Sequence, residues 1–385
     1  MNTKIGTLAL LVSTALLNAC SDSDNSSSDV QDVTPSGESS FTTVNLDASA
    51  GGFSAEPDSP ENKAVYFNFD SGETVDLSDD EALLSDAWHI AFKRTNTYFN
   101  GGSAGIGNVS SALLDAQSDY YDDQGVADNN VFLNTSAEAE LTSFNDATVS
   151  DQNFAVDTAK PAIVSDGSES SWWSYNSTTH ALSAEPNNWS IIRSATGDSY
   201  AKIHVTALDT TARSISVEMY VQAQSQSSFS DSSITWQADI GSTGGALCFD
   251  IDSDAEVDCE AQAESWDLRA EISADARSWT LWTNGGAYGD GSAGASLPEL
   301  DSSTVATYAG ASEVPGFFED SVSNAVKDNS WYAYNLQSQH KLWPNYRVYG
   351  VDTGTEIYKF QVIGYYDEAG NSGFISMRYI PLNAE

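Results

Sequence analysis

The stretch VYFNFDSGETVDL at residues 65–77 recurs, with altered letters, as LCFDIDSDAEVDC at residues 247–259. In both, a stretch rich in apolar residues is followed by a small polar dipeptide, at residues 71–72 and 253–254, and then by a second short stretch. Such a dipeptide between two stretches of this kind indicates the turn of a hairpin. The sequence therefore predicts the same β-hairpin twice.

The similarity between the two halves continues along the whole chain. The matching residues are Trp88 and Trp266, Asn100 and Asn284, Trp172 and Trp331, Tyr175 and Tyr334, His180 and His340, Lys202 and Lys359, and Met219 and Met377. Because all these blocks keep the same order, we infer a tandem duplication. Each repeat is far longer than a solenoid unit, so we expect two globular domains, at residues 41–230 and 231–385.

Both repeats end on an alternating segment. Ile215, Val217 and Met219 alternate with polar residues in the first repeat, and Ile375 and Met377 do so in the second. This spacing predicts a closing strand with one buried face in each repeat. We find no convincing helical stripe, and Gly, Ser, Thr and Asn are spread throughout. The predicted fold class is all-β, with antiparallel strands.

The composition excludes one large class of partner. The chain has 385 residues, with 15 Lys+Arg against 56 Asp+Glu, so its formal net charge is −41. A field of this sign repels phosphate, so we expect no nucleic-acid partner. The chain is also 40% hydrophobic, which is enough apolar material for folded cores. We interpret the acidity as a means of staying soluble in a saline habitat.

The N-terminus has the pattern of an export signal. Lys4 precedes an apolar run at residues 5–17 that is too short to span a bilayer. The letters LNAC at residues 17–20 resemble a bacterial lipobox. We therefore expect residues 1–19 to be a lipoprotein signal peptide. The alternative is an ordinary secretory signal that happens to contain a cysteine.

The residues after this signal predict how the protein is anchored. Cleavage would leave Cys20 as the lipidated N-terminus, and Ser21 after it indicates sorting to the outer membrane. Residues 20–40 are rich in Ser and Asp and predict a disordered tether. We therefore expect a protein anchored to the outer membrane by lipid, facing the periplasm or the cell surface.

Two cysteines remain once Cys20 is assigned to the lipid. A two-residue turn at residues 253–254 places Cys248 directly opposite Cys259. In an exported protein we expect this pair to form a disulfide, the alternative being two free thiols. The first repeat has Tyr66 and Leu77 at the same position, where packing would replace the cross-link.

Other motifs have simpler interpretations than catalysis or metal binding. The calcium-like pattern consists of Asp250, Asp252, Asp254 and Asp258. The first repeat already uses the aligned positions as a turn, so we do not expect calcium. The Asn-Gly-Gly blocks at 100–102 and 284–286 lack the lysine of a phosphate loop and are interpreted as turns. Because no catalytic motif is present, we expect no enzyme activity.

The histidines near the aromatic blocks are the candidate ligands. An imidazole beside aromatic surfaces offers what haem needs, a neutral nitrogen donor for iron and apolar walls for the macrocycle. The candidate cofactor-binding residues are His180, His340, Tyr175, Tyr334, Trp172 and Trp331, of which the two histidines would bind the metal. The alternative is a hydrogen-bonded loop histidine kept by duplication alone. Met219 and Met377 lie on an alternating apolar face and are assigned to the core.

Taken together, the blocks resemble the HmuY-like haem-binding lipoproteins. The resemblance rests on Val65 to Glu73, Trp88 to Phe92, Asn100 to Gly102, Trp331 to Leu342, Thr353-Gly354, Tyr358-Lys359 and Gly373 to Tyr379. It implies two such domains in tandem, in a non-catalytic protein that captures haem for iron acquisition. It also implies haem or a haemoprotein, and a TonB-dependent outer-membrane transporter, as partners. The alternative function is a cell-surface interaction or structural lipoprotein that uses this scaffold without haem.

The sequence departs from the family pattern at the iron ligands. The best-known pattern has one histidine before the W-x-x-Y block and one just after it. Residues 90–179 and 205–339 contain no histidine, so the first ligand is missing in both repeats. The candidate phenolate partners are Tyr120, Tyr121, Tyr288 and Tyr308. The candidate partners of the haem propionates are Lys202, Arg193, Arg347 and Lys341.

Overall fold

The computed structural model describes residues 41–51, 61–149, 152–289, 291–297 and 300–382. The predicted signal peptide, the tether and Cys20 lie outside these residues. Most of the regular structure consists of strands in antiparallel sheets, which confirms the all-β prediction. Among the described residues, no helix reaches the length and apolar character that crossing a membrane needs.

The first half of each repeat forms a four-stranded sheet with the same strand order. In the first repeat the order is β3-β2-β4-β5, and in the second it is β15-β14-β16-β17. The strands are β2 (Val65–Asn68), β3 (Glu73–Val75), β4 (Ile90–Lys93), β5 (Asn96–Phe99), β14 (Gly245–Asp250), β15 (Ala255–Val257), β16 (Leu268–Ile272) and β17 (Trp279–Thr283). The hairpins predicted at residues 65–77 and 247–259 are the first two strands of each sheet.

The second half of each repeat contributes to a larger sheet. One has the order β1-β25-β24-β23-β6, and the other has the order β13-β12-β11-β10-β18-β19. The strands of the first are β1 (Thr42–Asp47), β6 (Ser110–Asp115), β23 (Val348–Asp352), β24 (Ile357–Tyr366) and β25 (Ser372–Pro381). Those of the second are β10 (Ser190–Arg193), β11 (Tyr200–Asp209), β12 (Ser214–Gln222), β13 (Ile234–Asp239), β18 (Gly294–Ser296) and β19 (Phe317–Phe318). The closing strands predicted from alternation are β12 and β25.

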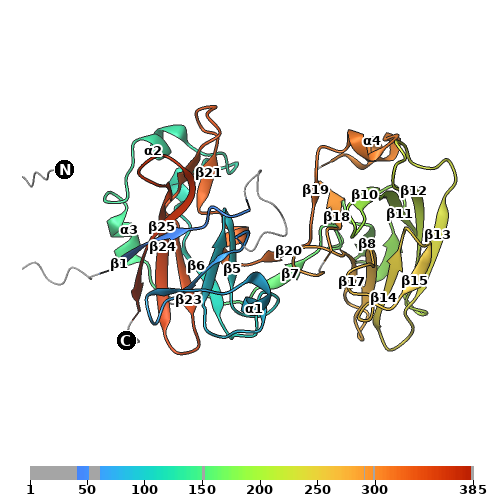
Figure 1. Ribbon diagram of the computed structural model, residues 1–385, viewed down its shortest axis with the longest axis horizontal. Helices are drawn as coiled ribbons and strands as arrows, with labels where there is room; N and C mark the ends of the chain where they lie inside the picture. Colours follow the sequence, from blue (N-terminus) through green and yellow to red (C-terminus); the bar gives the residue numbers. More distant parts are fainter. Residues whose placement is uncertain (1–40, 52–60, 150–151, 290, 298–299, 383–385) are drawn as a thin grey trace, which may run out of the picture. The chain divides into compact units, whose positions relative to one another are not determined.

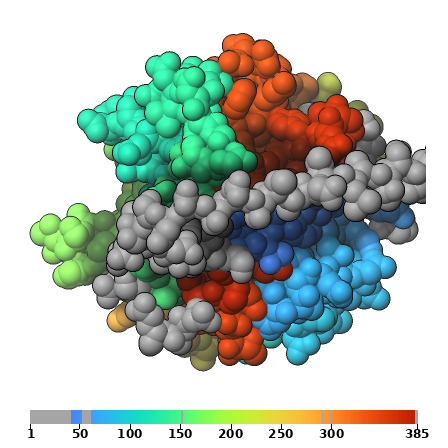
Figure 2. Space-filling model, turned by 90° about the vertical axis from the view of Figure 1, so that its left-hand side faces the viewer, coloured from blue at the N-terminus to red at the C-terminus, as the bar shows by residue number. Residues whose placement is uncertain are grey.

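The two hydrophobic cores do not follow the two repeats. The first core packs Phe67 and Ile90 of the first repeat against Tyr349 and Phe360 of the second. Accordingly, the blue β1 lies beside the red β25 in Figure 1, and early and late segments share one face in Figure 2.

The second core has the reciprocal composition. It packs Ile203 and Met219 of the first repeat against Leu268 and Trp279 of the second. Neither core therefore corresponds to residues 41–230 or 231–385, the domains expected from the sequence. The first half of each repeat packs with the second half of the other repeat. Residues 158–320 therefore contain the second core, and the remaining described residues contain the first. Because both repeats carry the same apolar pattern, periodicity could not predict which half packs with which.

The chain passes between the cores through two short strands paired with each other, β7 (Thr158–Lys160) and β20 (Ser321–Ser323). A buried aspartate precedes each strand. Asp157 accepts hydrogen bonds from the Phe99 amide at 3.1 Å and the Asn324 side chain at 3.0 Å. Asp320 accepts one from the Ala162 amide at 2.7 Å. The two crossings are therefore built in the same way.

The remaining elements are short. The helices are α1 (Asp79–Leu83), η1 (Ser118–Tyr120), α2 (Asn129–Leu133), α3 (Leu141–Asp146), α4 (Ser302–Thr307), η2 (Ala311–Glu313) and α5 (Ala325–Asp328). Two further hairpins consist of β8 (Trp173–Asn176) with β9 (Ala181–Ala184), and of β21 (Tyr332–Tyr334) with β22 (Leu342–Pro344). These two hairpins contain the candidate residues.

The predicted disulfide is present, but the predicted register is wrong. Cys248 and Cys259 are bonded, with their Cα atoms 5.4 Å apart. Cys248 nevertheless lies opposite Val257 in the sheet. The turn is longer than two residues because the Asp250 side chain accepts hydrogen bonds from the amides of the following residues, at 2.8 and 3.2 Å. Cys259 therefore follows the end of β15 and is not part of the ladder.

Candidate functional site

His180 and His340 lie in the turns of the β8–β9 and β21–β22 hairpins, and both are exposed. Their backbones have positive φ angles of 55° and 54°, a left-handed conformation that is uncommon outside glycine. Side chains of neighbouring asparagines hold these turns. Asn176 accepts from the Thr179 amide at 3.0 Å, and Asn335 accepts from the His340 amide at 2.9 Å. The turns therefore fix the position of each imidazole.

Each histidine is paired with the tyrosine of its own hairpin. The Tyr175 hydroxyl lies 2.6 Å from Nδ1 of His180, and the Tyr334 hydroxyl lies 2.7 Å from Nδ1 of His340. The tyrosines are 50% and 56% exposed. When Nδ1 donates its proton to the tyrosine oxygen, Nε2 keeps a lone pair for a metal. Within the described residues, each hairpin thus presents an oriented imidazole at the surface.

Trp172 and Trp331 do not have the role expected of them. They are 4% and 1% exposed and belong to the second and the first core, respectively. The indole of Trp172 also donates to Ser165 at 2.9 Å. Their bulk anchors the base of each hairpin to a core, because large aromatic surfaces are stabilised by removal from water. Neither indole therefore forms an exposed aromatic wall beside its histidine.

The other histidines are engaged in structural contacts. His89 is buried, its Nδ1 accepts from the Phe69 amide at 3.1 Å, and burial lowers its pKa. His204 contacts the Pro186 carbonyl at 2.7 Å through Nδ1 and Glu218 at 3.3 Å through Nε2. As predicted, Met219 and Met377 are core residues and are fully buried. Among the described residues, the exposed imidazoles are those of the two hairpins.

Lys202, which was proposed as a partner of the haem propionates, and its match Lys359 in the second repeat both donate to backbone carbonyls. Lys202 donates to the carbonyls of Ala306 and Tyr308 at 2.8 and 3.1 Å, at the end of α4. Lys359 does the same at the end of α3, at 2.8 and 3.0 Å. Burial lowers the pKa of both. The match between the two repeats at this position therefore reflects a shared helix-capping role.

The arginines proposed for the same role also bind carbonyls. Arg347 donates to Ala116 at 2.9 Å, and Arg193 donates to Ser292 at 2.8 Å. Lys341, next to His340, is exposed. It is the one cation of the proposed set for which the structure gives no carbonyl contact among the described residues.

The candidate phenolates have partners away from the hairpin histidines. Tyr120 is buried and donates to Thr135 at 3.2 Å, and Tyr121 accepts from Asn345 at 2.7 Å. Tyr288 donates to a carboxylate at 2.5 Å, and burial raises its pKa to about 12. Tyr308 is part of a small apolar cluster with Val305 of α4. None of these contacts prepares a phenolate for iron.

The acidic cluster of the second repeat holds a turn. The carboxylates of Asp250, Asp252 and Asp267 lie within 4.8 Å of one another. Asp267 accepts from the amides of Ala195 and Ile251 at 2.6 and 2.8 Å. Burial raises its pKa to about 7. His89 takes the place of Asp267 in the first repeat and likewise accepts a backbone amide, so the shared role is structural.

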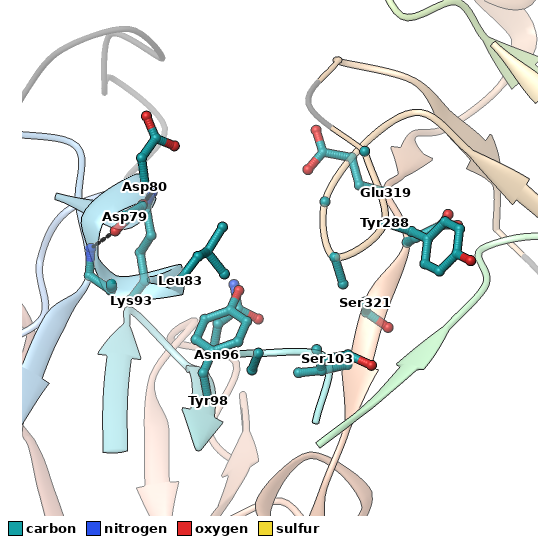
Figure 3. Close-up of a pocket in the computed structure, with 18 of the residues that line it drawn as sticks. Asp79, Asp80, Leu83, Lys93, Asn96, Tyr98, Ser103, Tyr288, Glu319 and Ser321 are labelled. Carbon is teal, nitrogen blue, oxygen red and sulfur yellow. Dashed lines mark hydrogen bonds and ion pairs between the residues drawn. The ribbon is translucent and has the colours of Figure 1, made fainter. Parts of the chain in front are cut away.

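A pocket of about 1280 Å³ lies away from the two histidine hairpins. Figure 3 shows Tyr98 and the Asp79–Lys93 ion pair on one side of it and Tyr288 and Glu319 on the other. The ion pair measures 3.0 Å. No histidine or methionine is among the described residues that line the pocket. It therefore offers no imidazole or thioether to iron, and no local sequence pattern predicted it.

Comparison with known proteins adds one finding. Residues 60–221 match the family model described as HmuY protein. No curated protein gives a significant match. The predicted resemblance is thus confirmed for the first repeat, which is HmuY-like, and it stays a prediction for the second. The matched segment draws on both cores, because the first repeat contributes to each of them.

Proposed function

Starting from this HmuY-like repeat, we propose that the chain is a non-catalytic haem-binding protein that serves iron acquisition at the outer membrane. Its anchor would be the lipid on Cys20, and its partner would be a TonB-dependent transporter that receives the haem. The lipobox-like letters at residues 17–20 support the anchor. Haem, free or taken from a haemoprotein, would be the cargo.

One observation carries this proposal. The same tyrosine–histidine pair is built twice, on equivalent hairpins, with Nδ1 engaged and Nε2 directed to no partner among the described residues. A histidine whose second nitrogen is held by a neighbour is a typical ligand of haem iron. Bound haem would supply an iron centre that accepts this nitrogen. The tyrosines would position the imidazoles.

The first experiment is a titration with haemin, followed by the Soret band. We expect a shift in the wild type and its loss in the variant His180→Ala/His340→Ala, because both exposed nitrogen donors are removed. His204→Asn is the matched control, since His204 is held by the Pro186 carbonyl and Glu218. A shift that survives in the double variant would contradict the proposal.

A second pair of substitutions tests the positioning role of the tyrosines. Tyr175→Phe/Tyr334→Phe keeps the rings but removes the oxygens that contact Nδ1. We expect haemin affinity to fall by about tenfold, as is common when the partner of a metal-bound histidine is lost. Circular dichroism should be unchanged, because both side chains are exposed.

A second function is favoured by the burial of Trp172 and Trp331. Because neither indole is exposed at its hairpin, the scaffold would then serve as a surface interaction or structural lipoprotein instead. No spectral change at micromolar haemin would support this alternative.

A further inference from the structure

The pocket of Figure 3 contains side chains that the proposed function does not use. One wall includes Asp80, Leu83 and Tyr98, and the opposite wall includes Glu264 and Glu319. Leu83 and Tyr98 extend toward the gap from one side, and Glu319 extends toward it from the other (Figure 3). The volume of about 1280 Å³ is larger than most sites for small ligands. The pocket therefore has room for a long ligand that contacts both walls.

The two walls are attached to the floor of the pocket by the Asn-Gly-Gly blocks. Gly102 forms a β-bridge with Asp157, and Gly286 forms one with Asp320. These aspartates directly precede β7 and β20, which pair with each other, and Ser321 of β20 lines the pocket. A Cβ atom on either glycine would overlap the carbonyl oxygen of its partner, so this close approach requires glycine. The two blocks that the sequence repeats therefore build the pocket.

The cationic side chains that line the pocket already have partners. They are Lys93 with Asp79 at 3.0 Å, Arg269 with Glu271 at 3.3 Å, and Lys327 with Asn96 at 2.6 Å. Because each of these cations is held by a neighbouring oxygen, the described lining is poorly suited to an anionic ligand.

Three carboxylates of the lining are exposed to the solvent. Asp80 and Glu264 form no hydrogen bond or ion pair with the part of the chain that the structure describes. Glu319 has one ion pair, at 3.6 Å to Arg193, and its side chain is 48% exposed. The pocket therefore carries negative charge on both walls that its own cations do not neutralise.

These carboxylates are too far apart to hold one metal ion together. Among the described residues, the one group of three acidic side chains close enough to do so consists of Asp250, Asp252 and Asp267, none of which lines the pocket. Charges on two walls are matched by a ligand with several separated positive charges. The pocket also exposes Leu83 and Phe318, 50% and 48% accessible, which favours apolar segments between those charges.

We propose that this pocket binds an aliphatic polyamine, a chain of ammonium groups separated by methylene segments. The ammonium groups pair with Asp80 on one wall and with Glu264 and Glu319 on the other, while the methylene segments pack on Leu83 and Phe318. The formal net charge of −41 attracts such a cation to the protein. The site lies away from the histidine hairpins, so it does not depend on haem.

The test is a calorimetric titration of the full chain with spermidine at low ionic strength. We expect saturable binding that weakens as salt is added, because salt screens exposed charges. The variant Asp80→Asn/Glu319→Gln removes one charge from each wall and should weaken binding by about tenfold. Circular dichroism should be unchanged, since both side chains are exposed.

The matched control is Asp231→Asn/Glu368→Gln. It removes the same charge from two exposed residues that do not line the pocket, so it should bind spermidine as the wild type does. An equal loss of affinity in both double variants would mean that the overall field of the protein attracts the polyamine, and would overturn the site.

Two further titrations complete the test. The monoamine propylamine should show no saturable binding at the same concentrations, because it cannot contact both walls. Saturable binding of magnesium that is lost in Asp80→Asn/Glu319→Gln would identify a metal site and overturn the choice of a polyamine. The absence of saturable spermidine binding by the folded wild type would overturn the proposal outright, whatever the result with haemin.

Discussion

Equivalent positions in the two repeats can hold different residues that have the same structural role. His89 and Asp267 both accept a backbone amide next to the first hairpin of their sheets. The two lysines that cap α3 and α4 are identical and also structural. Agreement between repeats therefore does not by itself mark a role in binding, because a shared role in the fold also produces it. The histidine hairpins differ, because their matching side chains are exposed.

Asp157 allows a prediction of pH dependence. One carboxylate oxygen, Oδ1, has no hydrogen-bond partner among the described residues, and burial raises the pKa of the group to about 7. The unfolded chain has the lower, ordinary pKa, so the folded state binds the proton more tightly. The contribution of this group to stability is complete below about pH 4 and is lost as the pH rises through about 7.

The variant Asp157→Asn tests this prediction. Its amide oxygen can accept the two bonds now made to Oδ2, and its NH₂ group takes the unpaired position. We expect the variant to be more stable than the wild type at pH 8, by about 2 kcal/mol, and the difference to vanish near pH 4. Urea unfolding at both pH values measures it, with Asp80→Asn as an exposed control. Equal stability at pH 8 would contradict the raised pKa.

At the scale of elements, the first hairpins of the two repeats are stabilised in different ways. The hairpin of the second repeat is closed by a disulfide, whereas Tyr66 and Leu77 of the first repeat pack in a small cluster with Trp88. Both hairpins have turns held by the side chain at their first residue, Asn68 or Asp250. Local hydrogen bonding therefore sets the turn, and the cross-link is an addition to it.

Removal of the disulfide should have a modest cost. The cysteines are separated by 11 residues, so the closed loop is small. We expect reduction, or Cys248→Ala/Cys259→Ala, to lower the free energy of unfolding by about 2–3 kcal/mol. Urea unfolding with and without reductant measures this change. If the reductant also destabilises the double variant, the effect does not come from this bond.

At the scale of the whole molecule, the exchange of halves is the main structural finding. Five strands follow an equivalent order in the two large sheets, and each sheet takes its strands from both repeats. The halves are joined through the β7–β20 pair, next to Asp157 and Asp320. Unfolding of one core should therefore involve residues of both repeats, because neither repeat contains a complete core.

Engineered cysteines can test the exchange. Ser110 of β6 lies opposite Asp352 of β23, so the pair Ser110→Cys/Asp352→Cys should form a disulfide. The matched control is Ser110→Cys/Arg193→Cys, because Arg193 of β10 pairs with Gly294 of β18 as Asp352 pairs with Ser110. Peptide mapping by mass spectrometry identifies the bond. A cross-link in the control but not in the first pair would mean that each repeat folds on itself.

The features that depend on neighbours in the chain could be predicted from the sequence. They include the alternating strands that end each repeat, the two first hairpins, the cysteine pair and the internal repetition. Tyr175 and His180 were predicted as candidate residues of one site. Their hairpin and their hydrogen bond were not predicted, because both depend on the backbone conformation of the turn.

The sequence by itself determined an all-β, acidic, duplicated chain with a candidate histidine in each repeat, since these properties are local or are sums over residues. Only the tertiary structure decided which halves share a core, because two repeats with the same apolar pattern fit each other as well as themselves. It also decided that Trp172 and Trp331 are buried while His180 and His340 are exposed. Burial depends on what the rest of the chain packs against a side chain, and a local pattern does not contain that information.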